Sequence, residues 1–139
     1  MIPADVTTEK LNAMSKKTMV EHLGIEFSEV GKDYLKARMP VDNRTVQPFR
    51  LLHGGASVAL AETLGSVGAH CLVNPETHNC VGLEINANHI RAARNGWVIG
   101  TARPLHIGRT TQVWEIKIED EEGKLVCISR ITMAILERK

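Results

Sequence analysis

The chain of 139 residues has few cysteines, and their positions favour no cross-link. Cys71, Cys80 and Cys127 are odd in number and irregularly spaced, and no Cys-x-x-Cys pair occurs. Neither a disulfide framework nor a zinc knuckle is therefore indicated. We expect reduced thiols and a cytoplasmic protein, because disulfides are rare in that compartment.

An excess of charge of one sign is also absent. Lysine and arginine together number 17 and aspartate and glutamate 16, which gives a net charge of +1. This balance provides no bulk attraction to nucleic acid or to an anionic membrane, so we expect neither as a partner. No apolar run is long enough to cross a bilayer. Residues 1–10 contain Asp5 and Glu9 and lack the apolar segment of a secretory signal.

Motifs for metal, nucleotide or serine-hydrolase chemistry are missing as well. The histidines form no His-x-x-x-His pair and no His-Glu dipeptide; they are His22, His53, His70, His78, His89 and His106. No P-loop and no Gly-x-Gly-x-x-Gly motif occurs. The stretch Gly65-Ser66-Val67-Gly68 lies inside an expected helix, whereas a nucleophile elbow needs a strand-to-helix turn. We therefore expect no metal site.

The order of the expected elements indicates the fold class. The length suits one domain, 1–139, and the 43% apolar and 24% charged residues are ordinary for a globular protein. Periodicity predicts a short helix over 8–21, strands over 25–30 and 35–41, a long helix over 53–73, and strands over 81–91, 97–103, 112–119 and 124–136. Runs of strands around a single helix predict an α+β fold. A mostly antiparallel sheet wrapped around one long buried helix is the hot-dog arrangement.

The segment 53–73, HGGASVALAETLGSVGAHCLV, is apolar on almost all sides, which predicts a buried helix. Its many small residues would let a sheet approach closely. Glu62 lies in its middle, and a buried carboxylate without a partner is costly. We therefore interpret Glu62 as a nucleophile or general base. The alternative is a carboxylate on a polar edge of the helix, paired with a surface lysine or arginine.

Three further groups could serve a reaction at Glu62. Ser66 follows one turn later on the same face, although a helical serine often bonds back to a carbonyl instead. The first N–H groups of the helix, at His53-Gly54-Gly55, have no internal partner, and glycine lets a ligand oxygen come close. They could form an oxyanion hole for a thioester carbonyl, or only a turn. Gln47, in the preceding loop, could polarise the same carbonyl or remain in solvent.

Two basic clusters lie near the ends of expected strands. They comprise His89, Arg91 and Arg94 in one place and His106, Gly108 and Arg109 in another. The second cluster falls in an expected loop over 105–109, where guanidinium and backbone N–H groups together could hold phosphate. The alternative is ordinary solvated surface.

Four stretches of the chain, taken in order, resemble one family. They are MPVDNRTVQPFRLLHGGASVALAETLGS, VGLEINANHIRAARNG, PLHIGRTTQVWEI and SRITMAIL. Together they resemble the bacterial hot-dog thioesterases of the PaaI-like and 4-hydroxybenzoyl-CoA thioesterase subfamily, which act on hydroxyaryl-coenzyme A esters. This subfamily includes the 1,4-dihydroxy-2-naphthoyl-CoA hydrolases and the enterobactin proofreading thioesterases. The resemblance covers nearly the whole chain.

The resemblance implies hydrolysis of acyl-CoA thioesters, with hydroxynaphthoyl or hydroxybenzoyl groups favoured and no cofactor, because the coenzyme A ester is itself the substrate. A dihydroxynaphthoyl substrate would place the enzyme in menaquinone biosynthesis. The resemblance also implies a catalytic carboxylate at Glu62, an oxyanion donor at Gly54, and supporting roles for Gln47, His53 and Ser66. Contacts with coenzyme A and substrate are implied at Gly82, His89, Ile90, Arg91, Ala92, His106, Ile107, Gly108, Arg109, Thr110 and Thr111.

Two chains are expected to build each site. The eight residues from Gly54 to Glu62 correspond to about 12 Å of helix. A thioester carbonyl must lie roughly 3 Å from its oxyanion donor and about 3 to 3.5 Å from the attacking group. One helix cannot meet both conditions, so we expect a homodimer with shared active sites. The resemblance implies that two such dimers associate.

The sequence departs from the family at Arg50. The family usually reads Phe-Gly-Leu-Leu-His-Gly-Gly where this chain has Phe49-Arg50-Leu51-Leu52. If this position needs a positive φ, arginine is strained there, and its side chain could narrow or charge the acyl pocket.

Two other functions stay open at this point. A hot-dog hydratase or dehydratase usually carries a His-Phe-Pro-Gly or an Asp-x-Asn-Pro-x-His motif, and neither is present. A non-catalytic acyl-CoA sensor would not need a costly buried carboxylate.

Overall fold

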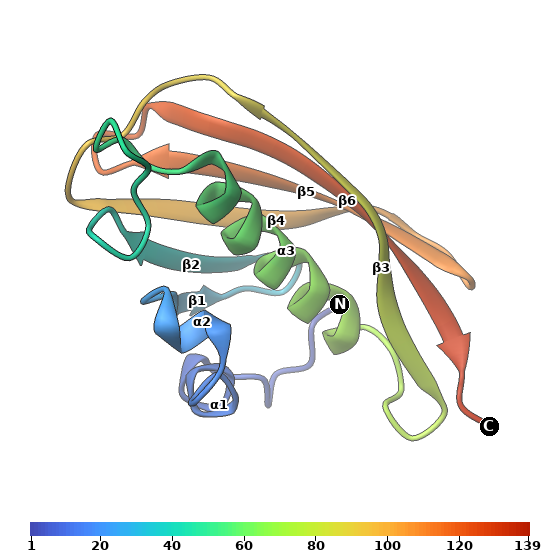
Figure 1. The fold of residues 1–139 in the computed structure, drawn as a ribbon. Coiled ribbons are helices and arrows are strands. Elements are labelled where there is room, and N and C mark those ends of the chain that lie inside the picture. The colour runs from blue at the N-terminus through green and yellow to red at the C-terminus, as the bar shows by residue number, and fades with distance from the viewer.

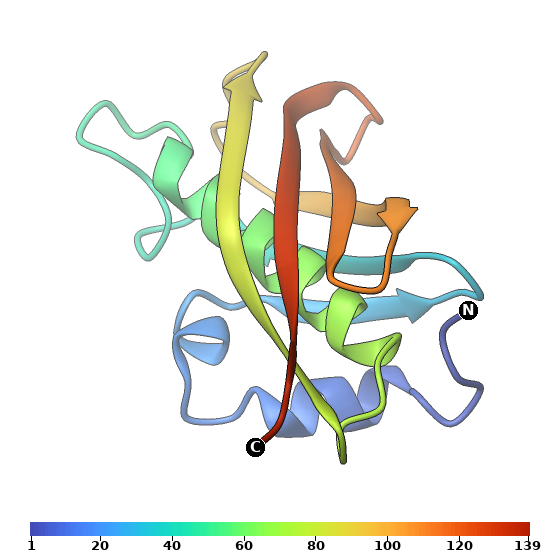
Figure 2. The same cartoon turned by 90° about the vertical axis from the view of Figure 1, so that its right-hand side faces the viewer.

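The computed structural model describes residues 1–139 and shows one antiparallel sheet curved around one long helix (Figure 1). The elements are α1 (Thr8–Met14), α2 (Met19–His22), β1 (Glu26–Val30), β2 (Leu35–Pro40), α3 (Gly54–Cys71), β3 (His78–His89), β4 (Trp97–Ile107), β5 (Thr111–Asp120) and β6 (Leu125–Glu137). The strands lie in the order β1-β2-β4-β5-β6-β3. Viewed from the side, β3 and β6 cross α3, while α1 lies near its C-terminal end (Figure 2). The predicted α+β arrangement is confirmed.

Small residues bring α3 close to the sheet. A Cβ atom on Gly68 would lie 2.8 Å from the ring of Trp114, and one on Gly65 would lie 2.5 Å from Cγ2 of Ile131. Both distances are shorter than the roughly 3.5 to 4.0 Å at which carbon atoms pack. The indole N–H of the buried Trp114 has a hydrogen-bond partner, because Nε1–H donates to Oε1 of the buried Gln112 at 2.8 Å.

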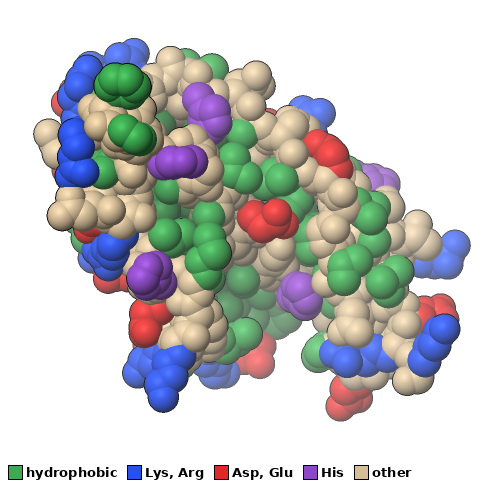
Figure 3. Space-filling view, in the orientation of Figure 1, with side chains coloured by type: hydrophobic (Ala, Val, Ile, Leu, Met, Phe, Trp, Pro, Cys, Tyr) green, Lys and Arg blue, Asp and Glu red, His purple; other side chains and the backbone are tan.

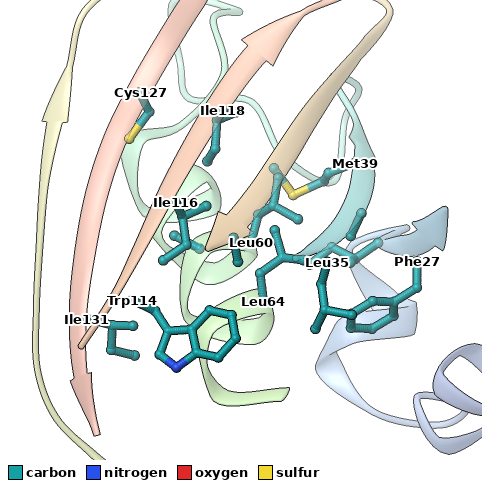
Figure 4. Close-up of a cluster of buried hydrophobic side chains, with 14 of the residues drawn as sticks. Phe27, Leu35, Met39, Leu60, Leu64, Trp114, Ile116, Ile118, Cys127 and Ile131 are labelled. Atoms are coloured by element: carbon teal, nitrogen blue, oxygen red, sulfur yellow. The ribbon is translucent and has the colours of Figure 1, made fainter. Parts of the chain in front are cut away.

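The core fills the space between α3 and the concave face of the sheet. Its fully buried members include Leu35, Ala37, Met39, Leu60, Leu64, Trp114, Ile116, Ile118 and Ile131 (Figure 4). The alternation predicted over 35–41 is confirmed from Leu35 to Met39, because the apolar residues are buried while Lys36 and Arg38 are not; Pro40, expected on the outward side, is buried instead.

One face of α3 is not covered within the chain. Glu62, Ser66 and Val67 are half-buried and His70 is exposed. The prediction that the whole helix is buried is therefore wrong for this chain, and so is the prediction that Glu62 is buried. Small and apolar residues on nearly every side suggested burial all round, but the chain supplies a sheet for only one side. Figure 3 shows many hydrophobic side chains on this open face of the molecule.

The predicted helix over 8–21 is two short helices. α1 ends at Met14 and α2 begins at Met19, each with a threonine cap, Thr7 and Thr18. Between them Lys17 has a φ of 62°, a left-handed conformation that no continuous right-handed helix contains. The weak apolar spacing of this segment did not predict the break.

β4 continues past the proline that was expected to end it. Pro104 pairs with Trp114, and the register shifts between Pro104 and His106. An irregularity of this kind absorbs the residue that cannot donate to the ladder. The loop predicted over 105–109 is therefore only a tight turn after Ile107. Similarly, β3 begins at His78, three residues earlier than predicted.

β3 is an edge strand with a bulge in its middle. Gly82 pairs with Met133 and Glu84 with Thr132, so Leu83 has no partner of its own. Leu83 is 62% exposed. The far edge of β3 pairs with no other strand of the chain, although β3 is 12 residues long.

The packing of α3 predicts the effect of Gly68→Ala. Alanine favours helix, but its methyl group would be forced into the Trp114 ring, so we expect unfolding to become easier by about 1–3 kcal/mol, the usual cost of overpacking. The control Thr63→Ala lies on the half-buried face and should change stability by less than about 0.5 kcal/mol. Urea denaturation measures both. Equal stabilities for the two variants would refute the close approach.

Candidate active site

An imidazole caps the N-terminus of α3. His53 has φ −68° and ψ 131°, and its Nδ1 accepts a hydrogen bond from the Gly55 N–H at 2.7 Å. The preceding N–H, that of Gly54, makes no hydrogen bond within the chain. It is therefore free to donate to a ligand at the positive end of the helix dipole.

A pocket of about 280 Å³ opens beside Gly54. It brings together Gln47, Gly54 and the run His89–Ala92, which are far apart in the sequence. A Cβ atom at Gly54 would lie 2.9 Å from Nε2 of His89, so glycine is needed for the ring to lie this close. Ser57 and Val126 also line the pocket and were not predicted. Ser57, three residues after Gly54, could have been found from helical spacing, whereas Val126 arrives through the pairing of β6.

The loop before α3 orients the side chain of Gln47. The backbone N–H of Phe49 donates to Oε1 of Gln47, and Gln47 N–H donates to the Leu51 carbonyl at 2.8 Å. Because Oε1 is engaged, Nε2 is the amide atom of Gln47 left to donate to a ligand. The neighbouring Phe49 side chain is 82% exposed.

Arg50 occupies the left-handed region of backbone space. Its φ is 67°, and a guanidinium N–H donates to Oδ1 of Asn43. The backbone at position 50 therefore does adopt a positive φ, and arginine is strained there.

Glu62 lies where α3, β3 and β6 meet. Its Oε2 accepts a long hydrogen bond of 3.5 Å from the Ser66 hydroxyl, which also lies 3.8 Å from Sδ of Met133. A Cβ atom on Gly82 would be 3.0 Å from the same Oε2. Gly82 therefore gives the carboxylate the room it occupies. Met133 was not predicted, because only the register of β6 against β3 brings it here.

The turn that contains the second basic cluster lies at this end of the sheet. Thr111 pairs with Ala134, next to Met133, and Ile135 N–H donates to the Thr110 carbonyl at 2.9 Å. His89 instead pairs with Cys127 near the other end of β6. The seven residues from Cys127 to Ala134 span about 23 Å of strand. One chain therefore does not bring the two basic clusters together.

The predicted residues thus form two separate groups. The Gly54 group consists of Gln47, His53, Gly54 and the run His89, Ile90, Arg91 and Ala92. The Glu62 group consists of Glu62, Ser66 and Gly82, with the turn His106, Ile107, Gly108, Arg109, Thr110 and Thr111 beyond it on the sheet.

The cysteines do not offer a competing nucleophile. Burial, together with the negative charge of Asp5, raises the pKa of the Cys71 thiol to about 11. Burial also raises the pKa values of Cys80 and Cys127. Since the thiolate is the reactive form, these shifts disfavour reaction at all three cysteines. No three His, Cys, Asp or Glu side chains lie close enough together to hold a metal ion, and no helix is suited to span a membrane.

Residues 49–127 match the family described as the thioesterase superfamily. The chain belongs to this superfamily, and it is an enzyme that hydrolyses thioesters. A 1,4-dihydroxy-2-naphthoyl-CoA hydrolase of Escherichia coli K12 is 56% identical over 131 residues, which cover 94% of this chain and 96% of the relative. A proofreading thioesterase EntH of Cronobacter sakazakii is also 56% identical over 131 residues, covering 94% and 95%.

Solved structures agree in fold. A mutant thioesterase from Pseudomonas aeruginosa is similar with a TM-score of 0.95 at 48% identity, covering 96% of each chain. A thioesterase from Haemophilus influenzae has a TM-score of 0.94 at 48% identity, covering 99% of this chain and 96% of the other. The predicted hot-dog fold is confirmed.

The strain at Arg50 leads to a stability prediction. Arg50→Gly should stabilise the protein by about 0.5–1 kcal/mol, because glycine removes roughly 1–2 kcal/mol of left-handed strain but is freer in the unfolded chain. The matched control Lys16→Gly, in a turn without positive φ, should destabilise it. Midpoints of urea denaturation report both changes, and a loss of stability in Arg50→Gly would show that the Asn43 contact outweighs the strain.

Proposed function

We propose that the protein hydrolyses hydroxyaryl-CoA thioesters to the free acid and coenzyme A, at sites that two protomers share. The observation that carries this proposal is the division of the site residues into a Gly54 group and a Glu62 group within one chain. Neither group alone has both an oxyanion donor and an attacking carboxylate.

The Gly54 group is suited to polarise the thioester carbonyl. The Gly54 N–H is unpartnered, and Gln47, whose Oε1 accepts from the Phe49 N–H and whose Nε2 is a donor, lines the same pocket. Preorganised donors of this kind stabilise the negative charge that develops on the carbonyl oxygen. His53 supports them indirectly, because its cap on Gly55 leaves Gly54 free.

Glu62 is suited to attack the carbonyl carbon or to deprotonate a water that does so. Its carboxylate is only half-buried and makes a single long hydrogen bond, to Ser66. It can therefore reach a substrate that approaches the open face of α3. Direct attack forms an anhydride between Glu62 and the acyl group and expels the coenzyme A thiolate; water then hydrolyses the anhydride, which releases the free acid and restores Glu62. In the general-base route, the oxygen of water adds to the carbonyl carbon before the C–S bond breaks. In both routes the proton lost by the water protonates the thiolate, and no cofactor takes part.

Pairing of two chains would unite the two groups. Gly54 and Glu62 are about 12 Å apart along the axis of α3, too far for one carbonyl. A two-fold axis could place the helix N-terminus of one protomer against Glu62 of the other. The long unpaired edge of β3, with exposed Val81 and Leu83, supports an interface there. The same pairing would bring Arg91 and Arg109 of different chains to one set of coenzyme A phosphates.

The acyl group, the pathway, the assembly and the cellular location are inferred from relatives, family resemblance and composition. The name of the Escherichia coli relative, a 1,4-dihydroxy-2-naphthoyl-CoA hydrolase, supports a hydroxylated aromatic acyl group and, by extension, a role in menaquinone biosynthesis. A further association into a dimer of dimers follows from the family resemblance. The three unpaired cysteines support a cytoplasmic location.

The role of Glu62 predicts the effect of Glu62→Gln. Glutamine keeps the shape but is neither basic nor nucleophilic, so kcat should fall at least about a hundredfold. Release of coenzyme A from hydroxybenzoyl-CoA, followed with a thiol reagent, gives the rate. The matched control Glu122→Gln changes an exposed carboxylate in the turn between β5 and β6 and should remain near normal. Normal turnover in Glu62→Gln would exclude the assignment.

The shared site predicts complementation between two inactive variants. When Gln47→Ala and Glu62→Ala chains are co-expressed, about half of the random dimers are mixed, and each mixed dimer holds one intact site. Activity should return to about a quarter of the wild-type value, given that each parent is nearly inactive. If one chain supplied both groups, the mixture would be no more active than its parents.

A second pair of variants is the control. Gly54→Val would collide with His89 and damages the same group as Gln47→Ala. In mixed dimers of these two variants every site remains damaged, so activity should not return. Recovery in this pair as well would mean that the activity comes from something other than sharing of sites.

A further inference from the structure

A stripe of three residues runs along the open face of α3. Glu62, Ser66 and His70 follow one another at intervals of four, so their side chains share that face. His70 is exposed, and its Nδ1 lies 2.8 Å from the Ser66 carbonyl oxygen. A carbonyl oxygen can only accept, so Nδ1 carries the proton. In the neutral ring Nε2 is then an unprotonated acceptor.

A cavity of about 570 Å³ lies beside this stripe. Ser66, Val67 and His70 of α3 line it, and α1 contributes Leu11 and Met14 opposite them. Its size falls within the roughly 300–1,000 Å³ of sites that bury small organic ligands. Figure 3 shows a hollow with hydrophobic side chains in it between the N-terminal helices and the ends of β3 and β6.

Polar and charged groups on several elements surround this cavity. Asp5, Lys10, His78 and Arg138 also line it. The ammonium group of Lys10 donates to the Asp5 backbone carbonyl at 2.9 Å. Lysine and arginine offer only donors. Asp5 and His78 could also accept, but they lie outside α3, whereas His70 is on the same helix as Glu62 and therefore lies at a fixed distance from it. Cys71, whose raised pKa keeps it a thiol, adds to the apolar wall.

The spacing of the stripe indicates the length of an acyl group that fits. Glu62 and His70 are about 12 Å apart along the helix. Roughly 3 Å separates an attacking group from a carbonyl carbon, and roughly 3 Å is a hydrogen bond to Nε2. About 6 Å therefore remains between the carbonyl carbon and a bonded hydroxyl oxygen. A benzene ring with its hydroxyl opposite the carbonyl has this length.

We propose that His70 determines specificity: its Nε2 accepts a hydrogen bond from a hydroxyl opposite the thioester on an aromatic acyl group held between α3 and α1. The inference rests on the proposed reaction at Glu62 and names the residue that recognises the far end of the same substrate. An unsubstituted ring leaves this acceptor unpaired, and a hydroxyl beside the thioester lies too close to Glu62 to reach it.

The test is the ratio of kcat/KM for 4-hydroxybenzoyl-CoA to that for benzoyl-CoA. In His70→Phe, which keeps an aromatic ring and removes the acceptor, the ratio should fall about three- to tenfold, the usual effect of one hydrogen bond. His70→Gln retains an acceptor and should keep more of the ratio. His22→Phe changes an exposed histidine on α2, away from the cavity, and should leave the ratio unchanged. The ratio for 2-hydroxybenzoyl-CoA should not respond to any of these changes.

The outcomes separate this inference from the proposed function. If the wild-type protein hydrolyses none of the three esters, the proposed function fails. If it hydrolyses them and His70→Phe lowers all three rates equally, His70 has only a structural role and the inference is overturned. A selective loss with 4-hydroxybenzoyl-CoA supports it.

Discussion

The close approach of α3 to the sheet is the constraint on which the rest of the structure depends. Gly65 and Gly68 let the helix backbone settle against Ile131 and Trp114, and the core closes around that contact. Because α3 lies so near the sheet, the same helix also meets the edge strand, where Gly82 makes room for the carboxylate of Glu62. Larger residues at these positions would move the helix outward and separate the carboxylate from β3 and β6.

A rigid helix also fixes how the chemistry is divided. Its N-terminus presents an unpartnered N–H at Gly54, while its middle presents Glu62 on a face that the chain leaves open. The distance between them is set by helical geometry and cannot be shortened by loop movement. Under the proposed mechanism, hydrolysis at this helix needs a second protomer, and the half-buried state of Glu62 is consistent with that proposal.

The sequence predicted the fold from local pattern and left long-range pairing unresolved. The alternation at Leu35, Ala37 and Met39 and the small residues of 53–73 were sufficient for the sheet and the helix, because both patterns record burial directly. Helical spacing likewise placed Ser66 beside Glu62. Met133 and Val126 were missed, because the register of β6 decides where they lie. The prediction that Glu62 is buried was wrong, because apolar neighbours in the sequence do not show which face of a helix packs against the rest of the chain.

The bulge at Leu83 has a consequence for the charge around Glu62. Up to the bulge, Cys80 and Gly82 face α3, and after it Ile85 and Ala87 pack toward the core. In a regular strand the next inward position after Gly82 would be that of Glu84, one step from the Glu62 carboxylate. The extra residue turns Glu84 outward, where it accepts a hydrogen bond from Asn86. The one-residue insertion thus keeps the Glu84 carboxylate away from that of Glu62. Two carboxylates this close would repel each other, and one of them would stay protonated and unreactive.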